Sequence, residues 1–589
     1  MAPALGVERS FSGYRWALRE VEDELAQSLS RHANISGVLA RLLAANGITA
    51  AEADGYLNPS LKNLLPEPFR FKDMEKAVAR VQAAIDAGER IAVFGDYDVD
   101  GSCSAALLSG FLSAIGRAPT VYIPDRLTEG YGPSADALLR LKEQGHTLVI
   151  TVDCGATATN ALTAAREAGL DVIVLDHHAI ETGSALAFAQ VNPNQPGDTS
   201  EHSYLCAAGV VFVFLVALNR ALRETGWYGA NGVTAPDLRA HVDLVGLATI
   251  CDVVPLVGVN RAFVRSALAR MSVQSRPGIT ALAEIAKAQA PFTPYHFGYV
   301  LGPRINAGGR IGRCSLGVEL LTSLDAAAAM PLALQLDRHN RERQAIEAVI
   351  LEEAMAQAST QDSAAFVLVH GEGWHAGVVG IIAGRLKERF DKLALAIGFE
   401  GGMGRGSARS VAGVDIGAII RAAREHGLLG AGGGHAMAAG FSLDAGQVEG
   451  FRDFLTERFA HAGSAPERAG ALELHGVISA AGATPGLVEE IGRAGPYGAG
   501  NPEPLLVAPD MRVAFADMVG QGHIRLRLEG TDGARLQAIA FRAAGSPLGE
   551  GLMKARGKRI HAAGTLKLDR WNGEERVQLQ LRDAAEAGA

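Results

Sequence analysis

The sequence predicts an α/β fold: a lobe built on a parallel sheet, then a long helix, a smaller α/β lobe and a C-terminal OB-like β-barrel. Apolar, β-branched runs alternate with helical stretches in the first half of the chain, a charged helix-forming segment follows, and short alternating strands recur near the C-terminus. With 589 residues and 48% hydrophobic content, the chain can bury several ordered cores.

The first lobe is predicted from its alternation of strands and helices. The strand-like runs are Ile91 to Gly95, Thr120 to Pro124, Leu148 to Asp153 and Asp171 to Asp176. The helical stretches between them are Ser102 to Ile115, Ser134 to Gln144 and Ala158 to Ala168. Such βαβ units make a mostly parallel sheet with helices on its faces, and ligands bind outside the carboxyl ends of its strands.

A long helix and a second lobe are expected next. Leu332 to Gln357 is rich in charged residues and helix formers, with a sparse apolar stripe. Its basic side chains, which form either a solvated face or the lining of a cleft, are Arg338, Arg341 and Arg343. The second lobe has strands at Ala365 to His370 and Leu393 to Phe399, and helices at Gly377 to Phe390 and Ile416 to His426.

The C-terminal region combines short strands with local positive charge, although the net charge of the chain is −9. Strand patterns occur at His523 to Leu528, Leu536 to Phe541, Ile560 to Leu568 and Val577 to Leu581. Between Met511 and Val577 there are 12 Lys or Arg residues and 7 Asp or Glu residues. This pattern favours an OB-like barrel that binds single-stranded nucleic acid. Because the span contains few aromatic residues, electrostatic contacts to the nucleic-acid backbone are expected to contribute more than base stacking.

Composition also bears on the compartment. The N-terminus has charges early and lacks the apolar core of a secretory signal. The longest apolar run, Leu205 to Leu218, has 14 residues and is predicted to be a buried helix. The five cysteines form no CxxC pair, which favours a reduced, cytoplasmic setting without a membrane span.

Polar residues fall at the ends of three predicted strands. Asp96, Asp98 and Asp100 follow the first strand, Asp153 ends the third, and Asp176, His177 and His178 end the fourth. A further acid, Asp252, ends the helix-like run HVDLVGLATIC. Because the carboxyl ends of parallel strands share one edge of the sheet, these side chains are expected to converge on one crevice.

Four carboxylates and one imidazole suit two divalent ions that share a bridging carboxylate. Oxygen-rich ligation favours manganese or magnesium over zinc, and two such ions suit in-line displacement at phosphorus. An EF-hand loop also begins Asp-x-Asp-x-Asp-Gly, but Leu107 then stands where that loop needs glutamate. A solvated acidic turn is the other alternative.

Basic residues in glycine-rich contexts indicate phosphate binding. Arg304, Arg310, Arg405 and Arg409 lie among small residues, where a guanidinium can meet a phosphate bidentately; plain surface charge is the alternative. The segment GAGGGHAMAAG brings His435 next to glycines whose amides can approach a phosphate or a base, although such glycines often make only a turn.

The ordered motifs GDYDVDG, VDCG, LDHH and LATICDVVPL resemble those of the DHH phosphoesterase superfamily, named for the triplet that here is Asp176-His177-His178. Further motifs are similar to those of its bacterial single-strand-specific exonucleases: LGPRINAGGR, WHAGVVGIIAGRL, GSARS, GAGGGHAMAAGFSL and PYGAGNPEPLL. The resemblance extends from about Ser10 to beyond Val577.

The resemblance implies five parts of the chain. They are an N-terminal extension (1–75), a DHH catalytic domain (76–324), a connecting helix between two lobes (325–360), a DHH-associated substrate-binding domain (361–465) and an OB-like nucleic-acid-binding domain (470–585).

The resemblance also implies roles for the motif residues. Two Mn²⁺ or Mg²⁺ ions would be held by Asp98, Asp100, Asp153, His177 and Asp252, with Asp153 as the bridge. Asp96 would be a direct ligand or lie just outside the ligands, and His178 would contact the scissile phosphate. The residues expected to bind substrate are Arg126, Arg304, Asn306, Arg310, Ser407, Arg409, Gly433, Gly434 and His435. Four of these, Arg126, Arg310, Ser407 and Arg409, are expected to hold a 5′-terminal phosphate.

The implied activity is 5′ to 3′ hydrolysis of single-stranded DNA to mononucleotides in DNA repair and recombination. The implied partners are single-strand-binding protein and a helicase, and the enzyme is expected to be a monomer. Two alternatives stay open: a DHH phosphodiesterase for short oligonucleotides or cyclic dinucleotides, and a non-catalytic DNA-binding scaffold on the same fold.

Overall fold

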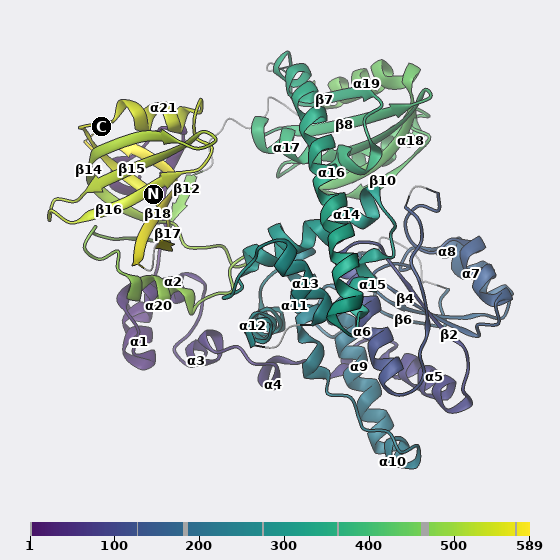
Figure 1. The fold of residues 1–589 in the computed structure, drawn as a ribbon. Helices are drawn as coiled ribbons and strands as arrows, with labels where there is room; N and C mark the ends of the chain where they lie inside the picture. Colours follow the sequence, from purple (N-terminus) through teal and green to yellow (C-terminus); the bar gives the residue numbers. More distant parts are fainter. Residues whose placement is uncertain are drawn as a thin grey trace. The chain divides into compact units, whose positions relative to one another are not determined.

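The structure is a computed structural model that describes residues 3–126, 128–180, 186–273, 276–361, 364–460, 471–571 and 574–588. The chain forms two compact units (Figure 1). One comprises Pro66–Asp252 and Ala267–Ala465, and the other comprises Met1–Leu65, Val253–Ser266 and Pro466–Ala589. In the described part of the chain, no helix is long and apolar enough to cross a membrane.

The first unit is built on the predicted parallel sheet, whose strand order is β3-β2-β4-β5-β6. The strands are β2 (Ile91–Gly95), β3 (Thr120–Tyr122), β4 (Leu148–Val152), β5 (Asp171–Leu175) and β6 (Ala189–Val191). Every residue of β2 and β4 is buried, because helices cover both faces of the sheet. The predicted α/β class is therefore confirmed.

Two helices cover one face of this sheet and three cover the other. The first pair is α7 (Ala135–Glu143) and α8 (Thr159–Glu167), which pack on β2, β4 and β5. The opposite set is α5 (Met74–Ala87), α6 (Val99–Ala114) and α9 (Ala207–Glu224). Helix α6 begins at Val99, earlier than the expected Ser102, because the Asp98 side chain caps it by accepting a bond from the amide of Gly101.

The remaining elements before the second lobe are helical. They are α10 (Trp227–Ala230), α11 (Val242–Cys251), α12 (Gly258–Val273), α13 (Pro277–Ile285), the π-helical turn η4 (His296–Leu301), α14 (Gly302–Ile311), α15 (Leu316–Thr322) and α16 (Ala326–Ser359). The predicted long helix is α16, and its arginines pair along the helix: Arg338 with Glu342, Arg341 with Asp337 and Arg343 with Glu347. Short 3₁₀ turns are η1 (Ala4–Gly6), η2 (Pro68–Arg70), η3 (Leu238–His241) and η5 (Ala445–Gln447).

The second lobe has a mixed sheet in the order β10-β11-β9-β8-β7. Its strands are β7 (Phe366–Glu372), β8 (Leu393–Glu400), β9 (Met403–Arg409), β10 (Ala431–His435) and β11 (Ala438–Asp444). One face packs on α16 and α17 (Ala376–Phe390), and the other packs on α18 (Ile416–Glu425) and α19 (Val448–Ala460). The glycine-rich segment therefore forms an edge strand, β10, and not only a turn.

The other unit contains the barrel. Strands β14 (Leu506–Val519), β15 (His523–Glu529), β16 (Arg535–Ala540), β18 (Glu574–Glu586) and β17 (Arg559–Trp571) pair in that order, and β17 pairs back with β14. This pairing closes a five-stranded barrel around an apolar core, as predicted. Helix α21 (Pro547–Lys554) and the short strand β13 (Gly476–Val477) complete it.

The first 65 residues belong to the barrel unit, which the sequence did not indicate. Strand β1 (Arg15–Leu18) pairs in parallel with β12 (Ala471–Leu474), and buried Trp16 donates to Asp583 of the barrel at 2.9 Å. The helices of the first 65 residues are α1 (Asp23–Ala33), α2 (Gly37–Ala45), α3 (Ala53–Leu57) and α4 (Leu61–Leu64), and α2 contacts α20 (Pro485–Gly492).

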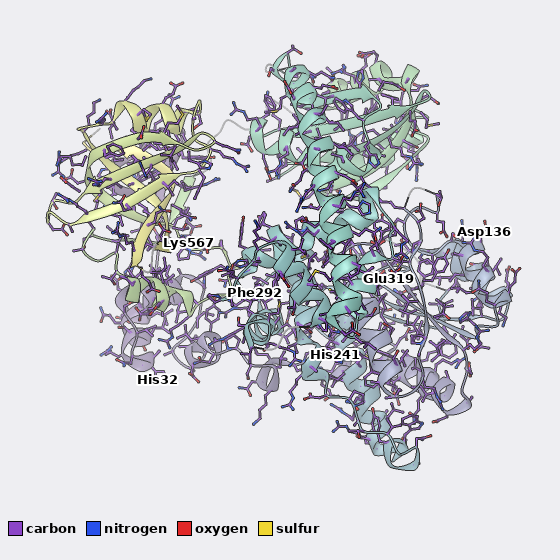
Figure 2. All side chains as sticks on the ribbon, in the orientation of Figure 1. His32, Asp136, His241, Phe292, Glu319 and Lys567 are labelled. Atoms are coloured by element: carbon purple, nitrogen blue, oxygen red, sulfur yellow. The ribbon has the colours of Figure 1, made fainter. Side chains whose placement is uncertain are left out.

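Two glycines of α6 provide a matched test of how closely the helix approaches β2. A Cβ at Gly101 would lie 2.5 Å from the carbonyl oxygen of Asp96, whereas a Cβ at Gly110 would meet only His241, labelled in Figure 2, at 3.8 Å. We expect Gly101→Ala to lower the free energy of unfolding by about 1 to 3 kcal/mol through overpacking. Gly110→Ala should be neutral or stabilising by up to about 1 kcal/mol. Urea unfolding measures both, and equal effects would contradict the close approach.

Candidate active site

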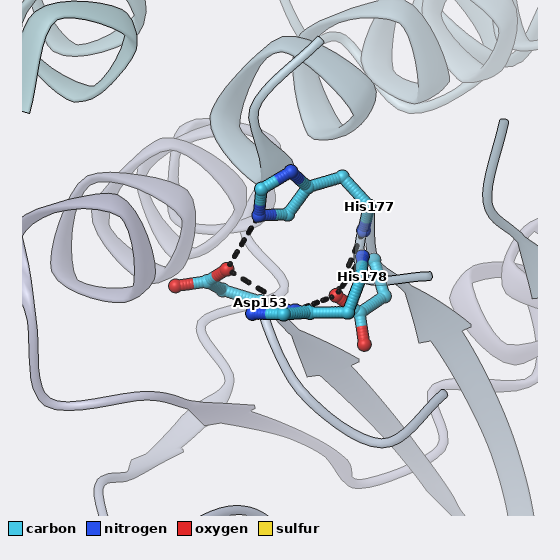
Figure 3. A group of neighbouring side chains, drawn as sticks. Asp153, His177 and His178 are labelled. Carbon is cyan, nitrogen blue, oxygen red and sulfur yellow. Dashed lines mark hydrogen bonds and ion pairs between the residues drawn. The ribbon is translucent and has the colours of Figure 1, made fainter. Parts of the chain in front are cut away.

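The strand-end residues predicted from the sequence meet at the carboxyl edge of the parallel sheet. Possible ligand atoms form three overlapping groups, within each of which all atoms lie within 4.8 Å of one another. The groups are Asp96, Asp98 and Asp153; Asp100, His177 and Asp252; and Asp153, Asp176, His177 and His178. Figure 3 shows His177 and His178 turned toward Asp153. The structure therefore brings together all the side chains expected to hold metal.

His177 lies at the centre of the site. Its Nε2 is 3.4 Å from Asp153 Oδ1, 3.5 Å from Asp252 Oδ2 and 3.8 Å from Asp100 Oδ2. Among the described side chains, His177 Nε2, Asp96 Oδ1 and Asp252 Oδ2 are buried polar atoms without a hydrogen-bond partner. Buried polar atoms are nearly always paired, so this arrangement fits cations held between these atoms.

The electrostatics of the site also favour cations. Burial raises the pKa of the Asp96, Asp100 and Asp153 carboxyls, and repulsion from neighbouring carboxylates adds to the effect. Burial, followed by repulsion from Asp100, raises the pKa of Asp252 to about 8. Without a cation these acids cannot all stay ionised near neutral pH, and a divalent ion removes that penalty.

Two helix N-termini stabilise part of the negative charge. Asp100 accepts bonds from the amides of Ala207 and Ala208, at 2.7 and 2.8 Å, where α9 begins. Asp98 accepts from Gly101 N at 3.0 Å, where α6 begins. The positive ends of both helices therefore point at the acidic site.

Asp153 is held in a backbone conformation that few non-glycine residues adopt. Its φ is +61°, and Gly155 follows with φ +104°, where a Cβ would lie 2.7 Å from Thr151 Oγ1. A left-handed non-glycine residue costs on the order of 1 to 2 kcal/mol. The strain accompanies the turn that places the Asp153 carboxylate beside His177.

Asp176 orients His178, a role that the sequence analysis did not assign. Asp176 Oδ1 lies 2.7 Å from His178 Nδ1 and accepts from the amide of His177. Burial alone would lower the pKa of His178 and raise that of Asp176, but their hydrogen bond outweighs it. The pKa of His178 is raised to about 9 and that of Asp176 is lowered to about 2, so the pair is ionic near neutral pH.

Three further residues support the site and were missed from the sequence. Asn192 and Asn194 donate to the backbone carbonyls of His178 and His177, at 2.9 and 2.5 Å. Tyr131 donates to the carbonyl of Asp153 at 3.1 Å and lies 3.4 Å from His178 Nε2. The position of Asn192 directly after β6, at the same sheet edge, is a signal that could have identified it.

A cavity of about 420 Å³ in the same unit is lined by basic residues from both lobes. Arg126 and Arg310 come from the first lobe, and Arg405, Ser407 and Arg409 come from β9. None of the described residues that line this cavity is acidic. The four residues expected to hold a terminal phosphate are thus brought together, and Arg405 joins them.

Positive charge in this cavity is poorly compensated. Burial, followed by repulsion from Arg126, lowers the pKa of Arg310 to about 10, and the same two causes lower the pKa of Arg409. Arg310 donates to the carbonyl of Gly377 at 2.9 Å, and Arg409 donates to Ser407 Oγ at 2.9 Å. Neither guanidinium has a carboxylate partner among the residues that the structure describes, and buried guanidiniums in this state suit an anion such as phosphate.

The other predicted substrate residues do not line the cavity. Arg304 donates to Asp337 at 2.9 Å, and Asn306 accepts from the amide of Val99 at 3.1 Å. The His435 ring stacks near that of His178, with centroids 6.5 Å apart. Gly433 and Gly434 lie in β10, and a Cβ at Gly434 would lie 2.4 Å from the carbonyl oxygen of Ala438, so the hairpin itself requires that glycine.

Family models match three segments of the chain. Residues 90–234 match the DHH family N-terminal domain, residues 362–461 match the DHHA1 domain, and residues 474–583 match the RecJ OB domain.

The chain is similar to curated proteins and to solved structures. It is 32% identical over 583 residues to the single-stranded-DNA-specific exonuclease RecJ of Bacillus subtilis (strain 168), covering 98% of this chain and 71% of that protein. It is 34% identical over 535 residues to RecJ of Escherichia coli (strain K12), covering 88% of this chain and 91% of that protein. The crystal structure of RecJ in complex with Mn²⁺ from Thermus thermophilus matches with a TM-score of 0.80 and 28% identity, over 98% of this chain and 80% of that one.

Metal binding should stabilise the protein, because cations relieve the repulsion among the buried acids. Mn²⁺ at a hundredfold excess over the dissociation constant should raise the free energy of unfolding by about 2.7 kcal/mol for each ion bound. Asp153→Asn should be at least as stable as the wild type without metal, since asparagine tolerates the left-handed backbone and removes a repelled charge.

In Asp153→Asn, Mn²⁺ should raise the free energy of unfolding by much less than in the wild type. Thermal unfolding with and without Mn²⁺ measures both effects. The control is Glu388→Gln, an exposed acid on α17, which should respond to Mn²⁺ like the wild type. A Mn²⁺ increment in Asp153→Asn equal to that of the wild type would contradict the site.

Proposed function

This chain belongs to the RecJ family of single-stranded-DNA-specific exonucleases, and we propose that it hydrolyses single-stranded DNA from the 5′ end to mononucleotides with Mn²⁺ or Mg²⁺. The observation that carries the proposal is the pairing, within one unit, of the acidic site around His177 with the arginine-lined cavity. An acidic site of this kind suits hydrolysis of a phosphodiester, and the cavity suits binding of a second phosphate group that does not itself react.

The residues that would hold the cations are Asp98, Asp100, Asp153, His177 and Asp252. Asp153 belongs to two of the three ligand groups, which supports its role as the bridge. Asp96, whose Oδ1 is buried without a partner, would be a direct ligand or lie just outside the ligands. Two divalent cations would supply Lewis-acid polarisation of the phosphoryl group and a water nucleophile at neutral pH.

His178 would contact the scissile phosphate. Its Nδ1 is bonded to Asp176, so Nε2, which lies 3.4 Å from the Tyr131 hydroxyl, is the ring nitrogen that would donate to a phosphate. A fixed imidazolium offsets negative charge that develops on the phosphoryl oxygens in the transition state. Asp176 acts through His178 by keeping the ring in place and in its charged form.

The polarity of cutting would follow from the cavity. Arg126, Arg310, Ser407 and Arg409 would hold the 5′-terminal phosphate, which carries more negative charge than an internal phosphodiester. The stacked rings of His178 and His435 lie close to the acidic site, and α14 supplies both Arg310 and Asn306. A strand anchored at its 5′ end would then present its first internal linkage to the cations.

The barrel would be a second contact for the strand. Arg525 and Arg556 lie over the ring of Phe515, at 6.0 and 5.9 Å from its centroid. Other barrel cations are paired with acids, for example Arg512 with Glu529 and Arg559 with Asp510. Backbone electrostatics and limited stacking would therefore hold the strand.

The cellular setting follows from the family as a proposal. The enzyme would act as a monomer in the cytoplasm, in DNA repair and recombination, beside single-strand-binding protein and a helicase. Two alternatives are less well supported. A cyclic dinucleotide offers no terminal phosphate for the arginine-lined cavity, and a non-catalytic scaffold has no use for strained, clustered acids such as Asp153.

The direct test digests single strands that carry a label at either end. With Mn²⁺, a 5′ label should appear first as a mononucleotide, while a 3′ label should stay on progressively shorter strands. Asp153→Ala should abolish release of both labels and retain strand binding. Early release of the 3′ label would contradict the polarity, and an active Asp153→Ala would contradict the assignment of the metal site.

The cavity can be tested through the substrate's 5′ end. Arg409→Met should remove most of the preference for a 5′-phosphorylated over a 5′-hydroxyl strand, a loss of roughly 10- to 100-fold for one charge-assisted contact. Activity on the 5′-hydroxyl strand should change little. Arg338→Met, whose side chain is exposed on α16, is the control and should keep the preference. Equal losses on both strands would argue against a phosphate-specific role.

A further inference from the structure

An aromatic segment outside the described site is exposed on the catalytic unit. Aromatic residues make up 6% of the chain, yet four of the eight residues from Phe292, labelled in Figure 2, to Tyr299 are Phe or Tyr. Tyr295 is 62% exposed and Tyr299 is 75% exposed. Their rings stack at 5.3 Å between centroids with an interplanar angle of 20°. Such a flat, exposed pair adds little to the core and offers a surface for another ring.

The back of this segment packs against the helix that leads to the metal site. Phe297 is fully buried, and its carbonyl accepts a bond from Cys251 Sγ at 3.4 Å. A Cβ at Gly302 would lie 2.5 Å from the same sulfur. Because Cys251 ends α11 and immediately precedes Asp252, the segment that carries the tyrosine pair packs, through Phe297, on the residue before a candidate metal ligand.

Three residues along helix α14 lie beside the arginine-lined cavity, the aspartate motif and the tyrosine segment, respectively. Arg310, near its C-terminal end, lines the arginine-lined cavity, and Asn306, in the middle, accepts from Val99 beside the aspartate motif. Arg304, near its start, donates to the carbonyl of Val300, next to Tyr299, at 2.6 Å. About 9 Å of helix separates Arg304 from Arg310. A strand anchored at Arg310 and cut near Asn306 would leave past Arg304 and the tyrosines.

Two arginines are linked to the tyrosine segment through the carbonyl of Val300, which accepts a bond from Arg304. Arg304 and Arg341 both bind the buried carboxylate of Asp337, at 2.9 and 2.5 Å. Two guanidiniums and one carboxylate leave one net positive charge, and the Arg341 side chain is 73% exposed. A flat aromatic surface beside such a charge suits a nucleotide, which has a ring to stack and a phosphate to pair.

We propose that the Tyr295–Tyr299 pair is a stacking site for a nucleobase of the single strand on the 3′ side of the cut linkage, with Arg341 beside the adjoining phosphate. The inference rests on the proposed exonuclease function and adds a subsite to it. The site would hold the strand between rounds of cutting without contacting the reacting phosphate.

Binding of strands with single abasic sites tests this site. The full chain carrying Asp153→Ala, in Mn²⁺, would be titrated with 5′-phosphorylated strands that lack one base at successive positions from the 5′ end. Loss of the base at one or two positions should weaken binding at least fivefold, as expected for one stacked base. In the same background, the double substitution Tyr295→Ala with Tyr299→Ala should weaken the binding of intact strands by a similar factor. In that variant, removing the base should have no further effect on affinity.

Two further variants separate stacking from folding. Tyr295→Phe with Tyr299→Phe keeps both rings and should bind within twofold of the background. Arg341→Met should weaken all strands and reduce the slope of log affinity against log salt by roughly 0.7, the value for one phosphate contact on a single strand. The proposal is overturned if the abasic effect persists in the alanine variant, if the phenylalanine variant loses as much as alanine, or if Arg341→Met leaves the salt slope unchanged.

Hydrolysis by the otherwise wild-type chain distinguishes this inference from the proposed function. A 5′-phosphorylated dinucleotide is too short to reach the tyrosine pair, so the alanine variant should cut it at the wild-type rate. If the wild type cuts neither the dinucleotide nor longer strands, the exonuclease function itself is wrong. If the wild type cuts both and the alanine variant matches it on longer strands at limiting substrate, only the stacking site is wrong.

Discussion

Repulsion among buried carboxylates is the constraint on which the rest of this structure depends. Asp96, Asp100 and Asp153 are almost fully buried at one edge of the parallel sheet, and burial raises the pKa of each. The fold meets this cost in part with two helix N-termini and with the His177 and His178 rings. The remaining deficit of positive charge is what divalent cations would supply.

The same unit also contains a cluster of positive charge that is not compensated by acidic residues in its described lining. The arginine-lined cavity gathers guanidiniums without an acidic residue among its described lining, and Arg310 is buried enough for its pKa to fall. An acidic site needs cations and a basic cavity needs an anion, and a nucleic-acid strand with bound divalent ions meets both needs. Helix α14 relates the two, since it holds Arg310 at one end and contacts the aspartate motif in its middle.

Much of the fold and of the acidic site could be predicted from sequence because both depend on local patterns. Continuous apolar runs such as Leu148–Val152 indicate strands buried on both faces, and the residues that follow them must lie at one edge. Asp176 and Asn192 were harder to assign. Their roles are hydrogen bonds to His178, and no pattern in the chain states which neighbour a side chain will contact.

The sequence by itself determined the parallel sheet, the set of acids at its carboxyl edge and the closed barrel, because strand periodicity and strand-end position are local properties. Only the tertiary structure decided that Arg405 lines the same cavity as Arg126, 279 positions earlier, that the first 65 residues fold with the barrel, and that Tyr295 and Tyr299 stay exposed. These outcomes depend on which surfaces pack together, and packing between distant segments is set by the whole chain.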